Sequence, residues 1–191
     1  MKIREFRRNN AQNTGFTLVE LMVTVAILVI LLAIGVPAMQ GFMAQRQGAA
    51  KTDAFASAMR YARSEALKRA QPVTICLTTT ADSTTPSCQT TGPIDWNTGW
   101  FIFVDNAPAD GSYDVNKELL LKVQQPFTGG GSIAQSAAGH RTVQFTGDGL
   151  AAGSDNTFTA VTTSGDCAAV VLAPTGRVRF DKTPRGTTPC L

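Results

Sequence analysis

Near the C-terminus, basic and apolar residues alternate in the run Gly176-Arg177-Val178-Arg179-Phe180. As a strand, this run places Arg177 and Arg179 on one face, about 6.6 Å apart, and turns Val178 and Phe180 inward. Guanidinium groups donate hydrogen bonds in a planar fork that fits phosphate oxygens. The pair therefore predicts electrostatic, largely sequence-independent binding of a phosphate backbone. The alternative is a solvated edge strand that uses its cations to prevent aggregation.

Two further cations, Lys182 and Arg185, follow in a Pro/Gly-rich segment and extend the predicted DNA-binding set. Residues 176–191 carry a net charge of +3, whereas residues 71–175 carry −6. The basic tail therefore contrasts with an acidic body. A second basic stretch is interpreted as the polar face of a helix; it contains Arg60, Arg63, Lys68 and Arg69.

Four cysteines allow three disulfide connectivities. Pairing in sequence order, Cys76 with Cys88 and Cys167 with Cys190, closes two local loops and would hold the basic tail against the body. Each closure could stabilise the fold by roughly 3 kcal/mol. Four reduced core cysteines are the alternative.

The sequence offers little for catalysis or metal binding. Its single histidine, His140, lies in a Gly-rich stretch, and no Cys-x-x-Cys pair is present. The run Gly129-Gly130-Gly131 lacks the Lys-Ser/Thr pair of a phosphate-binding loop and reads as a turn. We therefore expect no catalytic residues, no metal, no cofactor and no enzymatic activity.

The N-terminal segment is basic over residues 1–15, and no charged residue occurs from Leu21 to Gln45, which is long enough to cross a membrane. An ordinary secretory signal cut near Val36-Pro37-Ala38, which would suit a secreted hydrolase, is one interpretation. Glu20 argues against it, because a carboxylate at membrane depth costs up to about 2.5–3.5 kcal/mol unless it is paired. That cost makes Glu20 a candidate functional residue.

One helix and seven short strands must position these residues. The pattern predicts a helix from Phe16 to about Ala70, through Pro37, whose second half has an apolar stripe at Phe55, Met59, Ala62, Ala66 and Ala70. Trp96 and Trp100 are expected in the core. The predicted strands are Val73–Thr79, Gly99–Asp105, Glu118–Gln124, Thr142–Thr146, Thr157–Thr163, Ala168–Ala173 and Arg177–Phe180. Residues 80–98 and 125–140 read as surface loops. The fold class is α+β.

The N-terminal segment resembles the signal of type IV pilins and type II secretion pseudopilins in the run Gly15-Phe16-Thr17-Leu18-Val19-Glu20 and the apolar residues after it. This resemblance implies that a prepilin peptidase cleaves after Gly15 and that Phe16 becomes N-methylated. It also implies that the apolar segment is retained. In a filament, Glu20 could then pair with the N-terminal amine of a neighbouring subunit.

The head is similar to the GspH/FimT family of minor pilins and pseudopilins. The runs that carry this resemblance are Asp95–Asp105, Glu118–Leu120, Val143–Gly149 and Thr175–Arg179. It implies a type IV pilin-like fold, in which a long helix packs on an antiparallel β head with a disulfide-stapled C-terminus. The expected domains are a leader (1–15), a transmembrane and filament-core helix (16–45) and a periplasmic or extracellular head (46–191).

In FimT-type pilins of transformable bacteria, a Gly-Arg-x-Arg motif is associated with DNA uptake, and Gly176–Arg179 matches it. The resemblance thus implies a minor pilin that binds extracellular DNA during natural transformation. Its other expected partners are pilin subunits, the prepilin peptidase and the inner membrane. Before assembly it would span that membrane once, and afterwards it would lie in the pilus at the cell surface. The alternative is a structural or priming minor pilin, or a secretion pseudopilin, without DNA binding.

Overall fold

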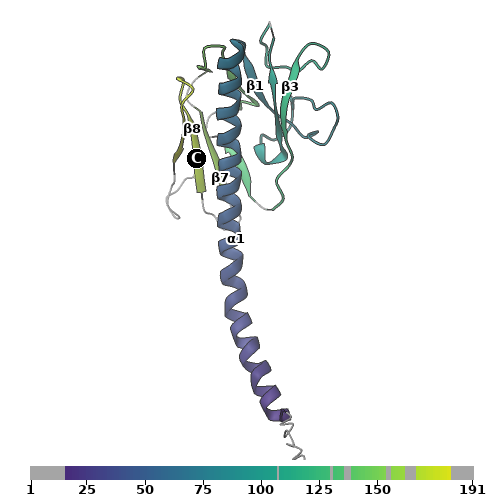
Figure 1. Ribbon diagram of the computed structural model, residues 1–191, viewed down its shortest axis with the longest axis vertical. Helices are drawn as coiled ribbons and strands as arrows, with labels where there is room; N and C mark the ends of the chain where they lie inside the picture. The colour runs from purple at the N-terminus through teal and green to yellow at the C-terminus, as the bar shows by residue number, and fades with distance from the viewer. Residues whose placement is uncertain are drawn as a thin grey trace, which may run out of the picture. The chain divides into compact units, whose positions relative to one another are not determined.

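The computed structural model of the chain describes residues 16–106, 108–129, 131–135, 139–153, 156–161 and 167–181. One long helix precedes a set of short strands, which confirms the α+β prediction (Figure 1). The helix, α1, spans Leu18–Arg69. The other elements described are β1 (Val73–Leu77), the 3-10 helix η1 (Trp96–Thr98), β2 (Trp100–Val104), β3 (Leu119–Gln124), β4 (Ser132–Gln135), β5 (Thr142–Phe145), β6 (Ala151–Ala152), β7 (Asn156–Val161), β8 (Cys167–Leu172) and β9 (Val178–Asp181).

The chain divides into two units, Met1–Gln40 and Gly41–Leu191. In the first unit, Leu18–Pro37 has 20 residues and a mean hydropathy of 2.8, so this part of α1 is long and apolar enough to cross a membrane. Pro37 lies inside α1 and does not end it, as expected. The helix starts at a capping residue, because the Glu20 backbone N–H donates to Thr17 Oγ1 at 3.2 Å.

In the second unit, α1 is amphipathic and provides one side of the core. Phe55, Met59, Ala62 and Ala66 are fully buried, as their spacing predicts. Ala70 was expected in the same stripe but lies beyond the end of α1, exposed and with a φ of 50°. This left-handed residue ends the helix, and the Gln71 N–H donates to the Ala66 carbonyl at 3.3 Å.

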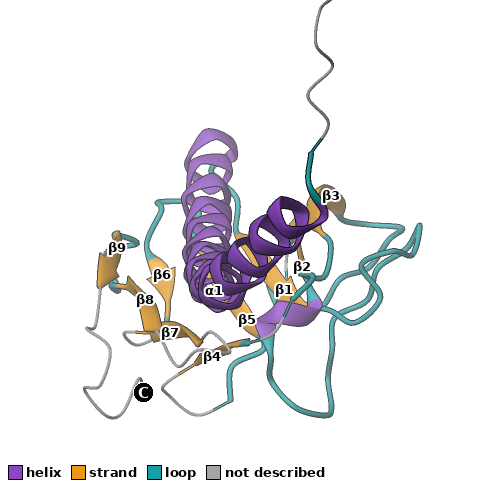
Figure 2. Cartoon of the chain, turned by 90° about the horizontal axis from the view of Figure 1, so that it is seen from below, coloured by secondary structure: helices purple, strands orange, loops and turns teal. Residues whose placement is uncertain are grey.

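Two antiparallel sheets pack against this part of α1 (Figure 2). One sheet has the strand order β3-β2-β1-β5-β6 and the other the order β4-β7-β8-β9. They meet at Phe55, whose ring centroid lies 5.0 Å from those of Trp96 and Trp100 and 4.8 Å from that of Phe158. Both tryptophans are buried, which confirms their predicted place in the core.

The predicted loop 125–140 contains a strand that the sequence did not indicate. β4 pairs with β7, with Ile133 opposite Ala160, and becomes an edge of the second sheet. The Asp95 carboxylate, which also caps η1, accepts a hydrogen bond from the Ile133 N–H at 2.9 Å. Four residues in a Gly/Ser-rich context give little local signal, so β4 depends on these distant partners. β6 has only two residues and was missed for the same reason.

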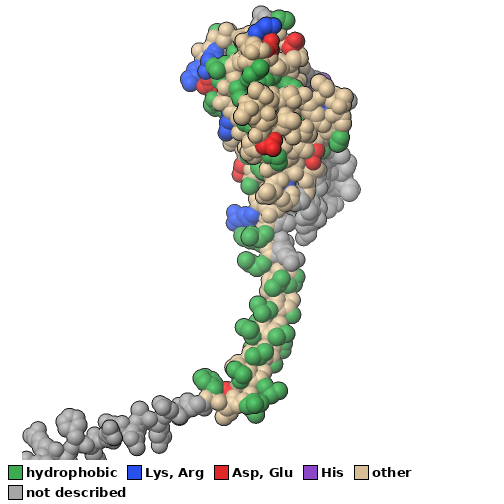
Figure 3. Space-filling model, turned by 90° about the vertical axis from the view of Figure 1, so that its right-hand side faces the viewer, with side chains coloured by type: hydrophobic (Ala, Val, Ile, Leu, Met, Phe, Trp, Pro, Cys, Tyr) green, Lys and Arg blue, Asp and Glu red, His purple; other side chains and the backbone are tan. Residues whose placement is uncertain are grey.

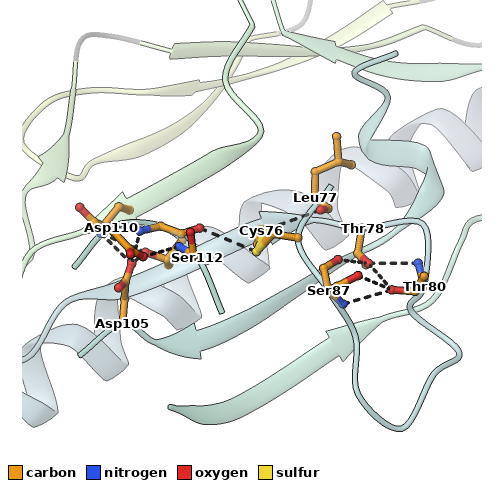
Figure 4. The surroundings of a disulfide bond; sticks show 12 residues. Cys76, Leu77, Thr78, Thr80, Ser87, Asp105, Asp110 and Ser112 are labelled. Carbon is orange, nitrogen blue, oxygen red and sulfur yellow. Dashed lines mark hydrogen bonds between the residues drawn. A yellow bond between two sulfur atoms is a disulfide. The ribbon is translucent and has the colours of Figure 1, made fainter. Parts of the chain in front are cut away.

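A disulfide joins Cys76 of β1 to Cys88, as predicted (Figure 4). The loop that it closes is also held by hydrogen bonds, since Thr78 Oγ1 donates to the Ser87 carbonyl at 2.7 Å and the Ser87 N–H donates to Thr80 Oγ1 at 3.1 Å. Cys76 packs with Phe101, Phe103 and Tyr113 in a small cluster separate from the main core. The second expected pair cannot be followed, because Cys190 lies outside the described residues.

Candidate nucleic-acid interface

The two predicted DNA-binding arginines lie on a hairpin at the edge of the second sheet. β9 pairs with β8 alone in the described sheet, with Val178 opposite Leu172 and Arg179 opposite Val171. Val178 packs against the core beneath α1. Because side chains alternate along a strand, Arg177 and Arg179 point from the face that lies away from α1, and both are exposed.

Phe180 turns toward α1 as expected, but the expectation that it is buried is wrong. Phe180 keeps 41% of its surface exposed, although it lies on the same face of β9 as Val178. The reason is its position at the edge of the described sheet, where α1 presents Arg60 rather than an apolar residue. The Arg60 guanidinium lies over the Phe180 ring, 5.0 Å from the centroid.

Gly176 forms the turn that precedes the arginines. Its N–H donates to the Ala173 carbonyl at 2.8 Å, and the Ala173 N–H donates to the Arg177 carbonyl at 3.0 Å. The φ of Gly176 is 74°, and a Cβ there would lie 2.2 Å from the Gly149 carbonyl oxygen and 2.8 Å from Arg63 Nε. Gly176 is buried. Its contribution is therefore to let three segments approach closely at the base of the hairpin.

Arg63 of α1 holds this turn in place. Its Nε donates to the Gly149 carbonyl and its Nη2 to the Thr175 carbonyl, each at 3.0 Å. One guanidinium thus joins the helix to two turns. Arg63 was expected only on the polar face of the helix, and this role was not predicted. No local pattern could have revealed it, because its two partners lie 86 and 112 positions away in the chain.

Two of the remaining helix cations are already paired. Glu65 is buried and accepts hydrogen bonds from Lys68 Nζ and Arg69 Nε, each at 3.0 Å. These bonds lower the pKa of the Glu65 carboxyl, although burial opposes them. Lys68 and Arg69 therefore neutralise a carboxylate at the end of α1, whereas Arg177 and Arg179 have no ion-pair partner among the described residues.

Several predicted site residues lie outside the described residues: Lys182, Arg185, Cys190 and Gly15. Phe16 and Glu20 are described at the start of α1, and both are exposed. The structure thus brings together Gly176, Arg177 and Arg179, and it adds Arg60 and Arg63 to their surroundings.

A shallow cavity of about 380 Å³ lies on another part of the head; it is lined by Ala109, Asp110, Gly111, His140, Thr142, Gln144, Ala152 and Gly153. Behind it, the buried Asp105 carboxylate accepts hydrogen bonds from Thr74 Oγ1 at 2.7 Å, the Gly111 N–H at 3.0 Å and Gln144 Nε2 at 2.9 Å. Figure 4 shows Asp105 beside Asp110 and Ser112. The described residues contain no cluster that could hold a metal ion.

Comparison with known protein families identifies both parts of the chain. Residues 51–176 match the family described as type II transport protein GspH. The chain belongs to the GspH family. Residues 10–36 match the prokaryotic N-terminal methylation motif, which agrees with the pilin-like signal at Gly15–Glu20.

Solved structures with the same fold are those of the type IV minor pilin FimU of Pseudomonas aeruginosa in two crystal forms. In the first, the identity is 18% and the TM-score 0.56, with 78% of this chain and 96% of that chain covered. In the second, the identity is 19% and the TM-score 0.51, with coverages of 76% and 96%. No curated protein matches the sequence.

This GspH-family chain is a GspH/FimT-like type IV pilin, from a family of minor pilins and pseudopilins. Such proteins are structural, are anchored in the inner membrane by their apolar helix and assemble with other pilins. The family match includes Arg63, Gly149 and Gly176 but ends before Arg177 and Arg179. The base of the hairpin therefore lies within the family match, and the two arginines follow its last residue.

Proposed function

We propose that this protein is a minor type IV pilin that captures extracellular DNA through Arg177 and Arg179 during natural transformation. The observation that carries the proposal is the exposed arginine pair at the start of β9, which follows a turn that Arg63 holds by a hydrogen bond. Two guanidinium groups fixed on one face of a strand can bind successive phosphates without reading the bases. Lys182 and Arg185 would add to the same basic segment.

Charge distribution supports this choice of partner. The net charge is −6 over residues 71–175 and +3 over residues 176–191, so a polyanion would be repelled by the strand-rich body and attracted at the basic tail. Figure 3 shows one face of the head, where Lys, Arg, Asp and Glu side chains all reach the surface. Binding of DNA would therefore be confined to one surface and would weaken steeply as salt is added.

Processing and topology complete the proposal. Cleavage after Gly15 would remove the leader (1–15) and expose the Phe16 amine for methylation. The segment 16–45 would then anchor the protein in the inner membrane with the head (46–191) in the periplasm. In the filament, the Glu20 carboxylate would pair with the amine of a neighbouring subunit, which would offset the cost of burying its charge.

DNA binding by the full-length chain in neutral detergent tests the proposal. The anisotropy of a labelled DNA should rise on titration, and Arg177→Ala/Arg179→Ala should strongly weaken the binding. If about three phosphates are engaged, log affinity should fall against log salt with a slope of about −2 to −3, and each lost arginine should reduce it by about one unit. Lys117→Ala/Lys122→Ala is the matched control, because it removes two exposed cations from another surface.

The alternative is a structural or priming subunit of a pilus or of a type II secretion pseudopilus. It is favoured by the family description itself, which names a type II transport protein. Wild-type protein without DNA affinity at low ionic strength would support this alternative and refute capture of DNA. In cells, the double arginine variant should lower transformation while pilus assembly continues, because both side chains are remote from the core.

A further inference from the structure

Phe180 of β9 and Arg60 of α1 form a contact that has no part in the proposed binding of phosphates by Arg177 and Arg179. Phe180 is 41% exposed, and it is the one exposed Phe, Tyr or Trp side chain among the described residues from Gly48 to Asp181. The Arg60 guanidinium lies 5.0 Å from the ring centroid. In the described sheet β9 lies at an edge, so no further described strand lies beside the ring on that side. A protein that only needed to bury Phe180 would cover it with apolar residues of α1.

The pair lies next to the arginines but on the other face of the strand. Arg177 and Arg179 project from the face away from α1, and Phe180 projects from the face toward α1. Because β9 is an edge strand of the described sheet, one bound strand of nucleic acid could contact both of its faces. Cations and an aromatic ring thus surround a single exposed edge.

Phosphates and bases need different partners, and this edge offers both. Guanidinium groups bind phosphate oxygens, whereas an exposed aromatic ring or a guanidinium plane stacks on the face of a base. In duplex DNA the base faces are stacked inside the helix and cannot reach a protein ring without disruption. In a single strand they are free.

We propose that the β9 edge binds single-stranded DNA in preference to duplex DNA, with the phosphate backbone on Arg177 and Arg179 and a base stacked at the Phe180–Arg60 pair. This inference rests on the proposed DNA binding and specifies single-stranded DNA as the preferred ligand. The preference is for single-stranded over duplex DNA and not for a particular base sequence, since every base has a face that can stack.

Titration of the full-length chain in neutral detergent against three labelled DNAs of equal length tests the inference. The DNAs are an oligothymidine, a duplex and an abasic strand that keeps the phosphates but has no bases. We expect the oligothymidine to bind about tenfold more tightly than either of the others, since stacking of one base on an aromatic ring has about this effect. The abasic strand separates stacking from the flexibility of a single strand.

Substitutions of Phe180 and Arg60 test whether these two residues produce the preference for single-stranded DNA. Phe180→Leu keeps an apolar side chain at the edge but cannot stack, so it should weaken oligothymidine binding about tenfold and leave duplex binding unchanged. Phe180→Tyr is the matched control and should retain the preference. Arg60→Lys keeps the charge but loses the planar group, and it should reduce the preference in the same direction.

Three results would overturn the inference: equal affinity for the oligothymidine and the duplex, equal affinity for the abasic strand and the oligothymidine, or a Phe180→Leu variant with the wild-type preference. In each of these cases DNA binding through the arginines would stand. If wild-type protein binds none of the three DNAs, the proposed function itself is wrong. The comparison of three DNAs uses only the wild-type chain, so it decides the matter even if a variant fails to fold.

Discussion

Arg63 connects the helix of this pilin to the turn that presents its basic hairpin. A half-buried guanidinium that donates to two backbone carbonyls at 3.0 Å is difficult to replace, because each carbonyl would lose a charged hydrogen-bond donor. Gly176 and Gly149 are needed beside it, since a Cβ at Gly176 would collide with both neighbours. These three residues set the orientation of the arginine pair without belonging to its exposed surface.

Replacement of Arg63 by Met should therefore lower the free energy of unfolding of the head by about 1–3 kcal/mol. DNA affinity should fall as well, because the turn that orients Arg177 would loosen. The slope of log affinity against log salt should stay the same, because Arg63 is not a proposed phosphate contact. Chemical denaturation and DNA titration of one preparation measure both effects. Arg63→Lys, which cannot reach both carbonyls, should be intermediate, and wild-type stability of Arg63→Met would contradict the assigned role.

Glu65 predicts a pH dependence at the end of α1. Hydrogen bonds from Lys68 and Arg69 hold the pKa of this carboxyl below its ordinary value in the folded state. The stability that they contribute is therefore fully present above the unfolded-state pKa and is lost as the pH falls through the lower folded-state pKa. Glu65→Gln should reduce stability at neutral pH and flatten the loss in acid. Unfolding curves across that acid range check this, and parallel curves for the two proteins would refute it.

At the scale of elements, the first sheet depends on β1, which lies at its centre and carries the disulfide to Cys88. The covalent link closes a loop with a sequence separation of 12. Hydrogen bonds of Thr78 and Thr80 to Ser87 hold the same loop from within. The loop is thus joined to β1 by a covalent bond and held by its own hydrogen bonds.

Cys76→Ala/Cys88→Ala should destabilise the head by about 3 kcal/mol, chiefly because the unfolded chain regains the freedom of this loop. Thermal unfolding under non-reducing conditions measures the effect. Peptide mapping of the wild-type chain should show the Cys76–Cys88 link and, as predicted from the sequence, a Cys167–Cys190 link. A Cys88–Cys167 link would contradict both the fold and the predicted anchoring of the tail.

At the scale of the whole molecule, the two units serve different environments. The first unit has apolar side chains exposed along Leu18–Pro37, which suits lipid or neighbouring pilin helices. The second unit uses the continuation of the same helix to build its own core around Phe55. One continuous helix therefore belongs to both the anchor and the head.

This organisation predicts the outcome of processing. Gly15→Glu should cause the full-length chain to accumulate, because the peptidase requires a small residue at the cut. The mature wild-type chain should begin with N-methylated Phe16, as mass spectrometry of its N-terminal peptide will show. A mature chain that begins at Met39 would instead establish an ordinary signal peptide and contradict retention of the anchor.

The sequence by itself determined the features that depend on local pattern: the run Gly15–Glu20, the uncharged segment, the apolar stripe at Phe55–Ala66, the strands around Trp100 and the alternation of Arg177 to Arg179. Each of these features depends on residues that are close together in the sequence, through the spacing of apolar side chains, their charge or their preference for turns. The local Cys76–Cys88 pair could be favoured for the same reason.

Only the tertiary structure decided which distant segments meet. Arg63 donates to carbonyls 86 and 112 positions away in the chain. β4 forms because it pairs with β7 and because its Ile133 N–H donates to Asp95. Phe180 stays exposed because α1 presents Arg60 there. The alternation of side chains predicted that Phe180 lies in the core. Alternation indicates on which face of a strand a side chain lies, but not which other residues cover that face. The physical reason is general: local geometry sets the direction of a side chain, and the packing of remote elements sets its environment.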